Sequence, residues 1–143
     1  MSTAFGSIVA GIVTRLQAAP AVSAQVYRAR LKPVAAQSDT AVVVRIRSSS
    51  AAPFAILNGP TDWDTLIDIE CYARSATLSP DAAADELLGA VYDRLSADPT
   101  LGGLVMDLGV TDLQYDFAAE ADQMACVTLT LKALHRTNNL SLE

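Results

Sequence analysis

The residues of this chain best suited to covalent chemistry are its two cysteines and its single histidine. A cysteine nucleophile needs a histidine within hydrogen-bond reach and a third group that orients the ring. Cys126 and His135 lie on one strand-like segment, about 30 Å apart if it is extended. The alternation around Cys71 turns that thiol toward the core. We therefore expect no catalytic residue, and two reduced, half-buried thiols in a cytosolic protein.

Two acidic residues, Asp62 and Asp64, flank Trp63 just before a strand-like segment. Carboxylate oxygens bind hard cations, but two acids alone make a thin coordination shell. A turn or cap role suits them better. The chain also contains no phosphate-loop, nucleophile-elbow, zinc-protease or paired-cysteine motif. The sequence predicts no metal, no cofactor and no enzymatic activity.

The overall composition points to one acidic domain, residues 1–143. The net charge of -6 argues against a nucleic-acid binder, which needs a basic face to displace counterions from phosphate. No run approaches the roughly 20 apolar residues that span a bilayer, and the N-terminus lacks the pattern of a secretory signal. We set aside Leu142 and Glu143, which are compatible with a cloning remnant.

Hydrophobic periodicity predicts two main helices and a set of strands. Apolar residues at three- and four-residue steps predict a helix over Thr3–Ala18, which Pro20 ends. Ser79 as N-cap and Pro80 at the first position start the second helix, and a short helical turn follows Asp98. Alternating segments predict strands at Gln25–Leu31, Ala41–Arg47, Thr65–Ala73, Leu113–Phe117 and Ala125–Leu134.

Two segments show no clear periodicity and are predicted as loops. Ser48–Asp64 is long for a connection, and long loops in compact domains are commonly functional. Ala118–Gln123 fits a hairpin loop. Because the strand faces alternate cleanly, we predict a two-layer α+β fold: an antiparallel or mixed sheet of about five strands with two main helices on one face.

One face of this sheet is predicted to be charged. We expect Tyr27, Val44, Ile69, Tyr115 and Leu129 to face the helices. The opposite face would then display Arg28, Arg30, Arg45, Arg47, Asp68, Glu70, Tyr72, Thr128, Thr130 and Lys132. Arg45 and Arg47 could pair across strands with Asp68 and Glu70. Two interpretations stay open: a solvated surface whose strands are linked by ion pairs, or a docking surface for an acidic protein partner.

The predicted loop over Ser48–Asp64 carries large apolar side chains, including Phe54 and Trp63. A solvated loop has no need of them, and aromatic anchors commonly dominate interfaces. Tryptophan is also highly buried on average, so Trp63 could equally cover the core of its own domain. Both interpretations of Trp63 stay open.

The segment Ala90–Val105 resembles a stretch common in minor tail proteins of long-tailed bacteriophages and prophages, in which a helix ends in Leu-x-x-Asp-Pro-Thr-Leu-Gly-Gly-Leu, here Leu95–Leu104. The surroundings agree: an arginine-bearing strand at Val26–Arg30, the Glu-Cys-Tyr-Ala-Arg strand at 70–74, and Thr-Leu-Thr-Leu at Thr128–Leu131. The group it most resembles is the tail terminator, or tail-completion, proteins.

The resemblance implies a structural role without catalysis. Such proteins form a hexameric ring that caps the tail tube, ends its polymerisation and offers a joining surface to the neck of the head. The implied partners are copies of itself, the tail tube protein and neck or connector proteins, with no sequence-specific nucleic-acid contact and no membrane. The implied location is the cytoplasm of the bacterial host during assembly, and then the virion tail.

The residues expected at its interfaces are Arg28, Arg30, Arg45, Arg47, Phe54, Trp63, Asp68 and Glu70. Three other functions stay open on the sequence. They are another small neck or head-closure connector protein, a small enzyme with a cysteine nucleophile, and an unrelated bacterial interaction module of the same architecture.

Overall fold

The computed structural model describes residues 2–29, 39–52, 59–74, 79–117, 124–138 and 141–143. Its elements in chain order are α1 (Ala4–Gln17), β1 (Val26–Arg28), β2 (Thr40–Ala51), β3 (Thr61–Arg74), α2 (Pro80–Ser96), a 3-10 turn η1 (Leu101–Gly103), β4 (Asp107–Phe117) and β5 (Met124–Thr137). The strands form one sheet in the order β1-β2-β3-β5-β4. β1 runs parallel to β2, and every other pair is antiparallel. The predicted α+β class with a mixed sheet is confirmed.

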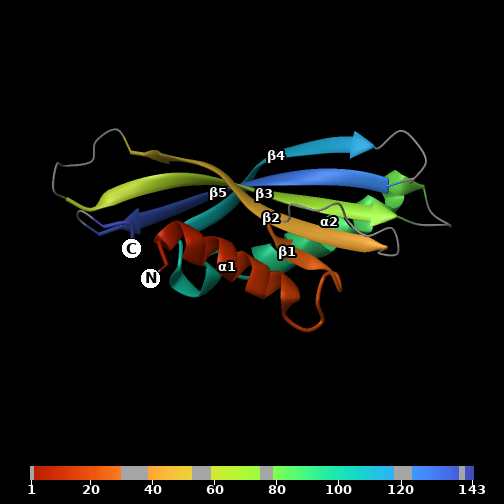
Figure 1. Cartoon of the computed structure of the whole chain (residues 1–143), viewed down its shortest axis with the longest axis horizontal. Helices are drawn as coiled ribbons and strands as arrows, with labels where there is room; N and C mark the ends of the chain where they lie inside the picture. The colour runs from red at the N-terminus through yellow and green to blue at the C-terminus, as the bar shows by residue number, and fades with distance from the viewer. Residues whose placement is uncertain (1, 30–38, 53–58, 75–78, 118–123, 139–140) are drawn as a thin grey trace.

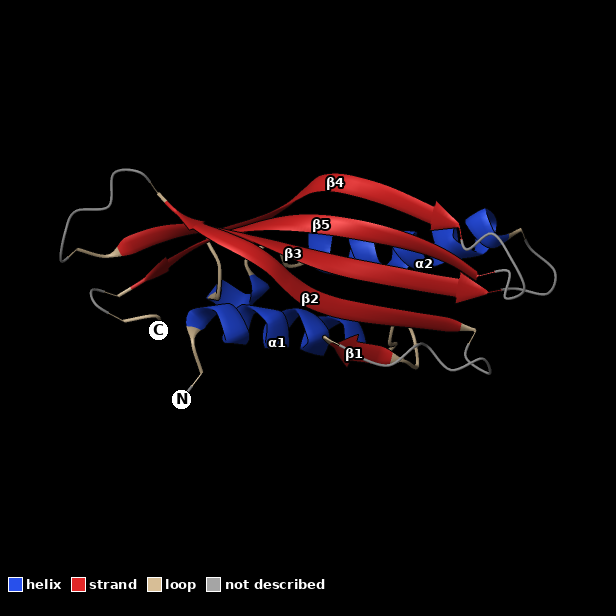
Figure 2. Ribbon diagram, turned by 45° about the horizontal axis from the view of Figure 1, so that its top comes forward, coloured by secondary structure: helices blue, strands red, loops and turns tan. Residues whose placement is uncertain are grey.

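The two helices lie on the same face of a long, twisted sheet (Figures 1 and 2). α1 packs mainly beneath β1 and β2, whereas α2 packs beneath β3 and β5. We call the side of the sheet that they cover the helix face, and the other side the open face. The ends of the chain lie close together, since the Ala4 amide donates to the Leu142 carbonyl at 2.7 Å.

The core lies between the helices and the middle of the sheet. Ile8, Ile12 and Leu16 follow one another along α1 at helical spacing and are fully buried, as the periodicity predicted. Val91 and Leu95 make the matching stripe on α2. The sheet supplies alternate residues to this core, namely Val42, Val44, Ile67, Ile69, Cys71, Leu129 and Leu131.

Asp98, in the Asp-Pro-Thr-Leu-Gly-Gly segment, connects α1 to η1 through its carboxylate. The Asp98 carboxylate accepts a hydrogen bond from the Gly102 amide at 3.2 Å and pairs with the Arg15 guanidinium of α1 at 2.6 Å. Gly102 has a φ of 70°, a conformation in which a side chain would be strained. The motif that carries the sequence resemblance therefore serves the packing of α1.

The strands that flank the predicted 48–64 loop, β2 and β3, are each longer than predicted. β2 continues to Ala51 and β3 already begins at Thr61, so both ends of that segment pair as strands, with Ser50 opposite Asp64. The bulge between Ile46 and Ser48 interrupts the period of two and hid this extension. The predicted loop over 118–123 lies outside the described residues.

β4 begins at Asp107, six residues before the predicted start at Leu113. Two features masked this half of the strand. Gly109 has low strand propensity, and a bulge at Thr111 shifts the pairing between Val110 and Asp112. The side chains on the two sides of the bulge therefore do not follow one alternation.

Two residues expected against the helices occupy other environments. In β1 it is Val26 that enters the core, so the prediction for Tyr27 is wrong: Tyr27 pairs with Val43 on the open face. Tyr115 has the register of the helix face, opposite Val127, but 55% of it is exposed because the helices cover β3 and β5 more than the edge strand β4. None of the described helices is long and apolar enough to cross a bilayer.

Candidate functional site

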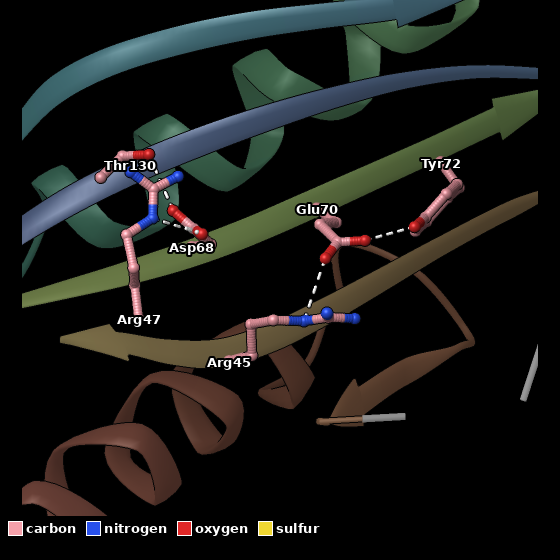
Figure 3. A network of polar contacts seen from close by, with 6 residues as sticks. All are labelled: Arg45, Arg47, Asp68, Glu70, Tyr72 and Thr130. Carbon is pink, nitrogen blue, oxygen red and sulfur yellow. Dashed lines mark hydrogen bonds and ion pairs between the residues drawn. The ribbon is translucent and has the colours of Figure 1, made fainter. Parts of the chain in front are cut away.

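The predicted charged face exists, and its centre is a pair of arginine–carboxylate contacts between β2 and β3 (Figure 3). Arg45 Nε lies 3.0 Å from Glu70 Oε1, and Arg47 Nε lies 2.9 Å from Asp68 Oδ2. Both contacts are diagonal, because the backbone partner of Arg45 is Asp68. The register shift between Ile46 and Ser48 leaves Arg47 without a backbone partner on β3, and its side chain reaches Asp68 on the open face.

The two carboxylates are fixed from the other side as well. Asp68 Oδ1 accepts a hydrogen bond from the Thr130 hydroxyl of β5 at 2.8 Å, and Glu70 accepts one from the Tyr72 hydroxyl. Burial, and then the bond to Glu70, raise the pKa of Tyr72 well above its ordinary value, so this hydroxyl stays a donor. Each acid therefore orients one arginine while a hydroxyl holds the acid.

The arrangement places acids inside and cations outside. The side chains of Asp68 and Glu70 are 13% and 16% exposed, whereas those of Arg45 and Arg47 are each 45% exposed. Exposed pairs of this kind add at most about 1 kcal/mol each to stability. What they do provide is a set of guanidinium groups held in fixed orientations, which lowers the side-chain entropy lost when a partner binds.

Asp62 and Asp64 belong to β3 and do not serve as turn or cap residues, which corrects the prediction. Asp62 pairs with Arg136 at 2.6 Å, and Asp64 with Lys132 at 3.4 Å. The hydrogen bond from Arg136 lowers the pKa of Asp62. Across the part of the chain that the structure describes, no three metal-ligating side chains come together.

The thiols are in environments that oppose thiolate chemistry. Cys71 is buried in the core, and this burial, followed by the charge of Cys126, raises its pKa to about 12. Burial also raises the pKa of Cys126, which lies on the open face beside Tyr72. A reactive cysteine needs the opposite shift. His135 points to the helix face of β5, so it cannot act on Cys126.

Trp63 lies on the helix face and packs within its own chain. Its ring meets Phe5 of α1 edge-on, with centroids 5.2 Å apart, and its indole nitrogen donates to Thr137 Oγ1 at 2.9 Å. Phe5 also contacts His135, at 5.0 Å between centroids. Trp63 is half-buried in this aromatic cluster, so its substitution would change packing as well as any interface.

The buried imidazole of His135 predicts a pH dependence of stability. His135 Nε2 bonds Thr65 Oγ1 at 2.7 Å, while Nδ1 has no partner among the described residues. Burial disfavours the charged ring and lowers its pKa below 6.5. The unfolded chain then binds the proton more readily, so stability should be complete above about pH 6.5 and fall as the pH drops below it.

Urea unfolding of the wild type and of His135→Gln at about pH 7 and pH 5 measures this effect. The glutamine amide can keep the bond to Thr65 but does not titrate in this range. The free-energy advantage of the wild type should shrink on acidification. An advantage that is the same at both pH values would show that His135 contributes no such dependence.

Of the interface residues predicted from the sequence, Trp63 packs within its own chain as described above, and the others fall into three groups. Arg45, Arg47, Asp68 and Glu70 come together on the open face as expected. Arg28 does not join them: it has the register of the buried Val44, and its guanidinium lies on the helix side near Gly6 of α1. Arg30 and Phe54 lie outside the described residues.

Sequence reasoning missed a second surface, at the edge of the sheet. Val110, Leu113 and Tyr115 of β4 share the helix face, yet each is 39–55% exposed. Tyr92 of α2 is also exposed, and a small cavity of about 80 Å³ lies between α2 and β4. The alternation of β4 correctly indicated apolar residues on one face, but only the position of α2 shows that this face is left open.

Comparison with known proteins gives a structural match only. No family model and no curated protein matches the sequence. Among solved structures, the chain is similar to a chain of the "Virion of native gene transfer agent (GTA) particle", with a TM-score of 0.60 and 18% identity over 91% of this chain and 95% of that one. The two chains share a fold. The arrangement of helices and strands that carries the charged face and the β4 edge here is thus also found in a chain of a virion particle.

Proposed function

We propose that this protein is a structural component of a phage-like particle, and that it acts there as a tail terminator. It caps the tail tube as a ring of copies, ends tube polymerisation and presents a surface to the neck. The observation that carries the proposal is the fold shared, over nearly the whole of both chains, with a chain of a gene transfer agent virion. The Leu95–Leu104 segment, which resembles tail-completion proteins, supports the same role.

The open face suits a docking role within such a particle. Its guanidinium groups are half-exposed and already oriented by Asp68 and Glu70, so a partner with acidic groups can bind them without ordering long side chains. Charged groups at an interface chiefly determine specificity and orientation. We infer that this face meets the tube protein or the neck.

Deletion of the gene in the particle that encodes it tests the proposal. Without a cap, tube growth has no fixed end, so we expect tails of uneven length that lack heads, measured by electron microscopy. Expression of the wild-type protein should restore uniform, joined tails. Tails of normal length without heads would indicate a neck connector instead, and infectious particles with normal tails would overturn the structural role.

A charge-reversal pair tests the docking face itself. Arg45→Glu should reduce the yield of joined particles about tenfold or more, because a docking contact would become a repulsion. Arg28→Glu is the matched control, since Arg28 has the same residue type but lies on the helix side. Equal yields from the two variants would show that Arg45 is not part of a docking surface.

A further inference from the structure

We propose that copies of this chain associate head to tail through the two outer edges of the sheet, β4 of one copy pairing with β2 of the next. The inference rests on the proposed function, because it names the surface through which the copies of the ring meet. The evidence is the chemistry of the two edges. On the open face one edge is acidic and the other basic, and on the helix face both edges are apolar.

The first edge is β4. Among the described strands β4 pairs only with β5, so its outer row of backbone groups faces no strand along the whole of Asp107–Phe117. Its open face carries Asp112 and Asp116, which form no ion pair within the described chain. Its helix face carries the exposed apolar residues Val110 and Leu113. A long edge of this kind is a template for another strand.

The second edge is the far half of β2. β1 pairs only with Val42–Val44, so 45–51 of β2 faces no described strand on its outer side. Here the open face carries Arg45 and Arg47, and the helix face carries Ile46, which is 44% exposed. β2 contains no acidic residue and β4 contains no basic residue.

The two edges also match in direction and register. In the order β1-β2-β3-β5-β4, β4 and β2 run in opposite directions, so a second copy with the same face outward brings its β2 antiparallel to β4. The register that puts Asp116 beside Arg47 ends β4 beside Ile46, within the residues 45–51 that β1 leaves free. Opposite charges then meet on the open face, while both edges present apolar side chains on the helix face.

Such a contact is heterologous, since β4 and β2 are different surfaces. A heterologous contact closes into a ring when its rotation divides a full turn, and otherwise continues as an open filament. Charge and apolar complementarity therefore select a second copy of this chain as the occupant of the β4 edge, in preference to an unrelated partner.

Two single-edge variants test the inference in purified protein. Leu113→Lys damages β4 and leaves β2 intact, while Ile46→Lys does the reverse. We expect concentration-dependent assembly of the wild type in analytical ultracentrifugation, and a monomer for each variant alone. An equimolar mixture should give dimers and nothing larger, because only one intact β4 and one intact β2 can then meet.

Leu104→Lys is the matched control, since Leu104 is similarly exposed but belongs to neither β2 nor β4, and its side chain lies beside Gly11 of α1. It should assemble like the wild type, and circular dichroism should show that all variants are folded. A monomeric wild type at every concentration, or variants that assemble alone, would overturn the edge pairing.

The gene deletion described above is independent of these results. Edge pairing without any tail defect would refute the proposed function alone, and a tail defect with a monomeric protein would refute the edge pairing alone.

Discussion

Leu16→Ala is expected to destabilise the protein by about 2–5 kcal/mol, the range measured for fully buried leucines. Leu16 is 0% exposed on α1, and it packs in the cluster formed by both helices and the middle of the sheet. Truncation removes apolar contact and leaves a cavity that the paired strands on one side cannot close. Urea unfolding at neutral pH measures the loss as a lower midpoint with an unchanged slope.

Leu104→Ala is the control for this prediction. Leu104 is 46% exposed, so the same truncation should cost no more than about 0.5 kcal/mol. Similar unfolding midpoints for the two variants would mean that α1 is not anchored through Leu16.

The second large effect is expected at Arg94, whose replacement by alanine should cost about 1.5–3 kcal/mol. Arg94 of α2 reaches the end of α1, where its Nη1 donates to the Arg15 and Ala18 carbonyls at 2.8 Å each. Its Nη2 donates to the Pro20 carbonyl. The last carbonyls of a helix have no partner within the helix, and a charged donor is worth about 1.5–3 kcal/mol to such a group before exposure reduces it.

Arg136→Ala separates this role from a general loss of charge. Arg136 also makes two side-chain bonds, both to Asp62, but the pair is largely exposed and should contribute at most about 1 kcal/mol. Thermal unfolding of the two variants should therefore differ clearly. Equal melting temperatures would contradict the assignment of Arg94 as the cap of α1.

Local patterns were sufficient for the elements whose residues alternate or repeat without interruption. The 3.6-residue spacing of Ile8, Ile12 and Leu16 predicted α1 and its buried side. The alternation of Ile67, Ile69 and Cys71 likewise assigned the two faces of β3, and with them the open-face positions of Asp68 and Glu70. These predictions hold because a regular strand or helix leaves only one way to bury its apolar side.

Interrupted strands were the ones that local patterns misassigned. The bulge after Ile46 and the bulge at Thr111 each add a residue that breaks the period of two, so β2 and β4 looked shorter than they are. Arg28 was misassigned for a related reason. β1 is only three residues long, and a shift of one residue in so short a strand exchanges its two faces.

Residues that are neighbours along the chain were therefore enough to predict an α+β chain with two amphipathic helices, an acidic net charge and a charged strand face. Three features came from the folded chain: Trp63 packs on Phe5, Arg47 and not Arg45 meets Asp68, and no described strand pairs with the outer side of β4 or of half of β2. Those features depend on strand order, bulges and the reach of the helices. They arise from contacts between segments far apart in the chain, which no local pattern encodes.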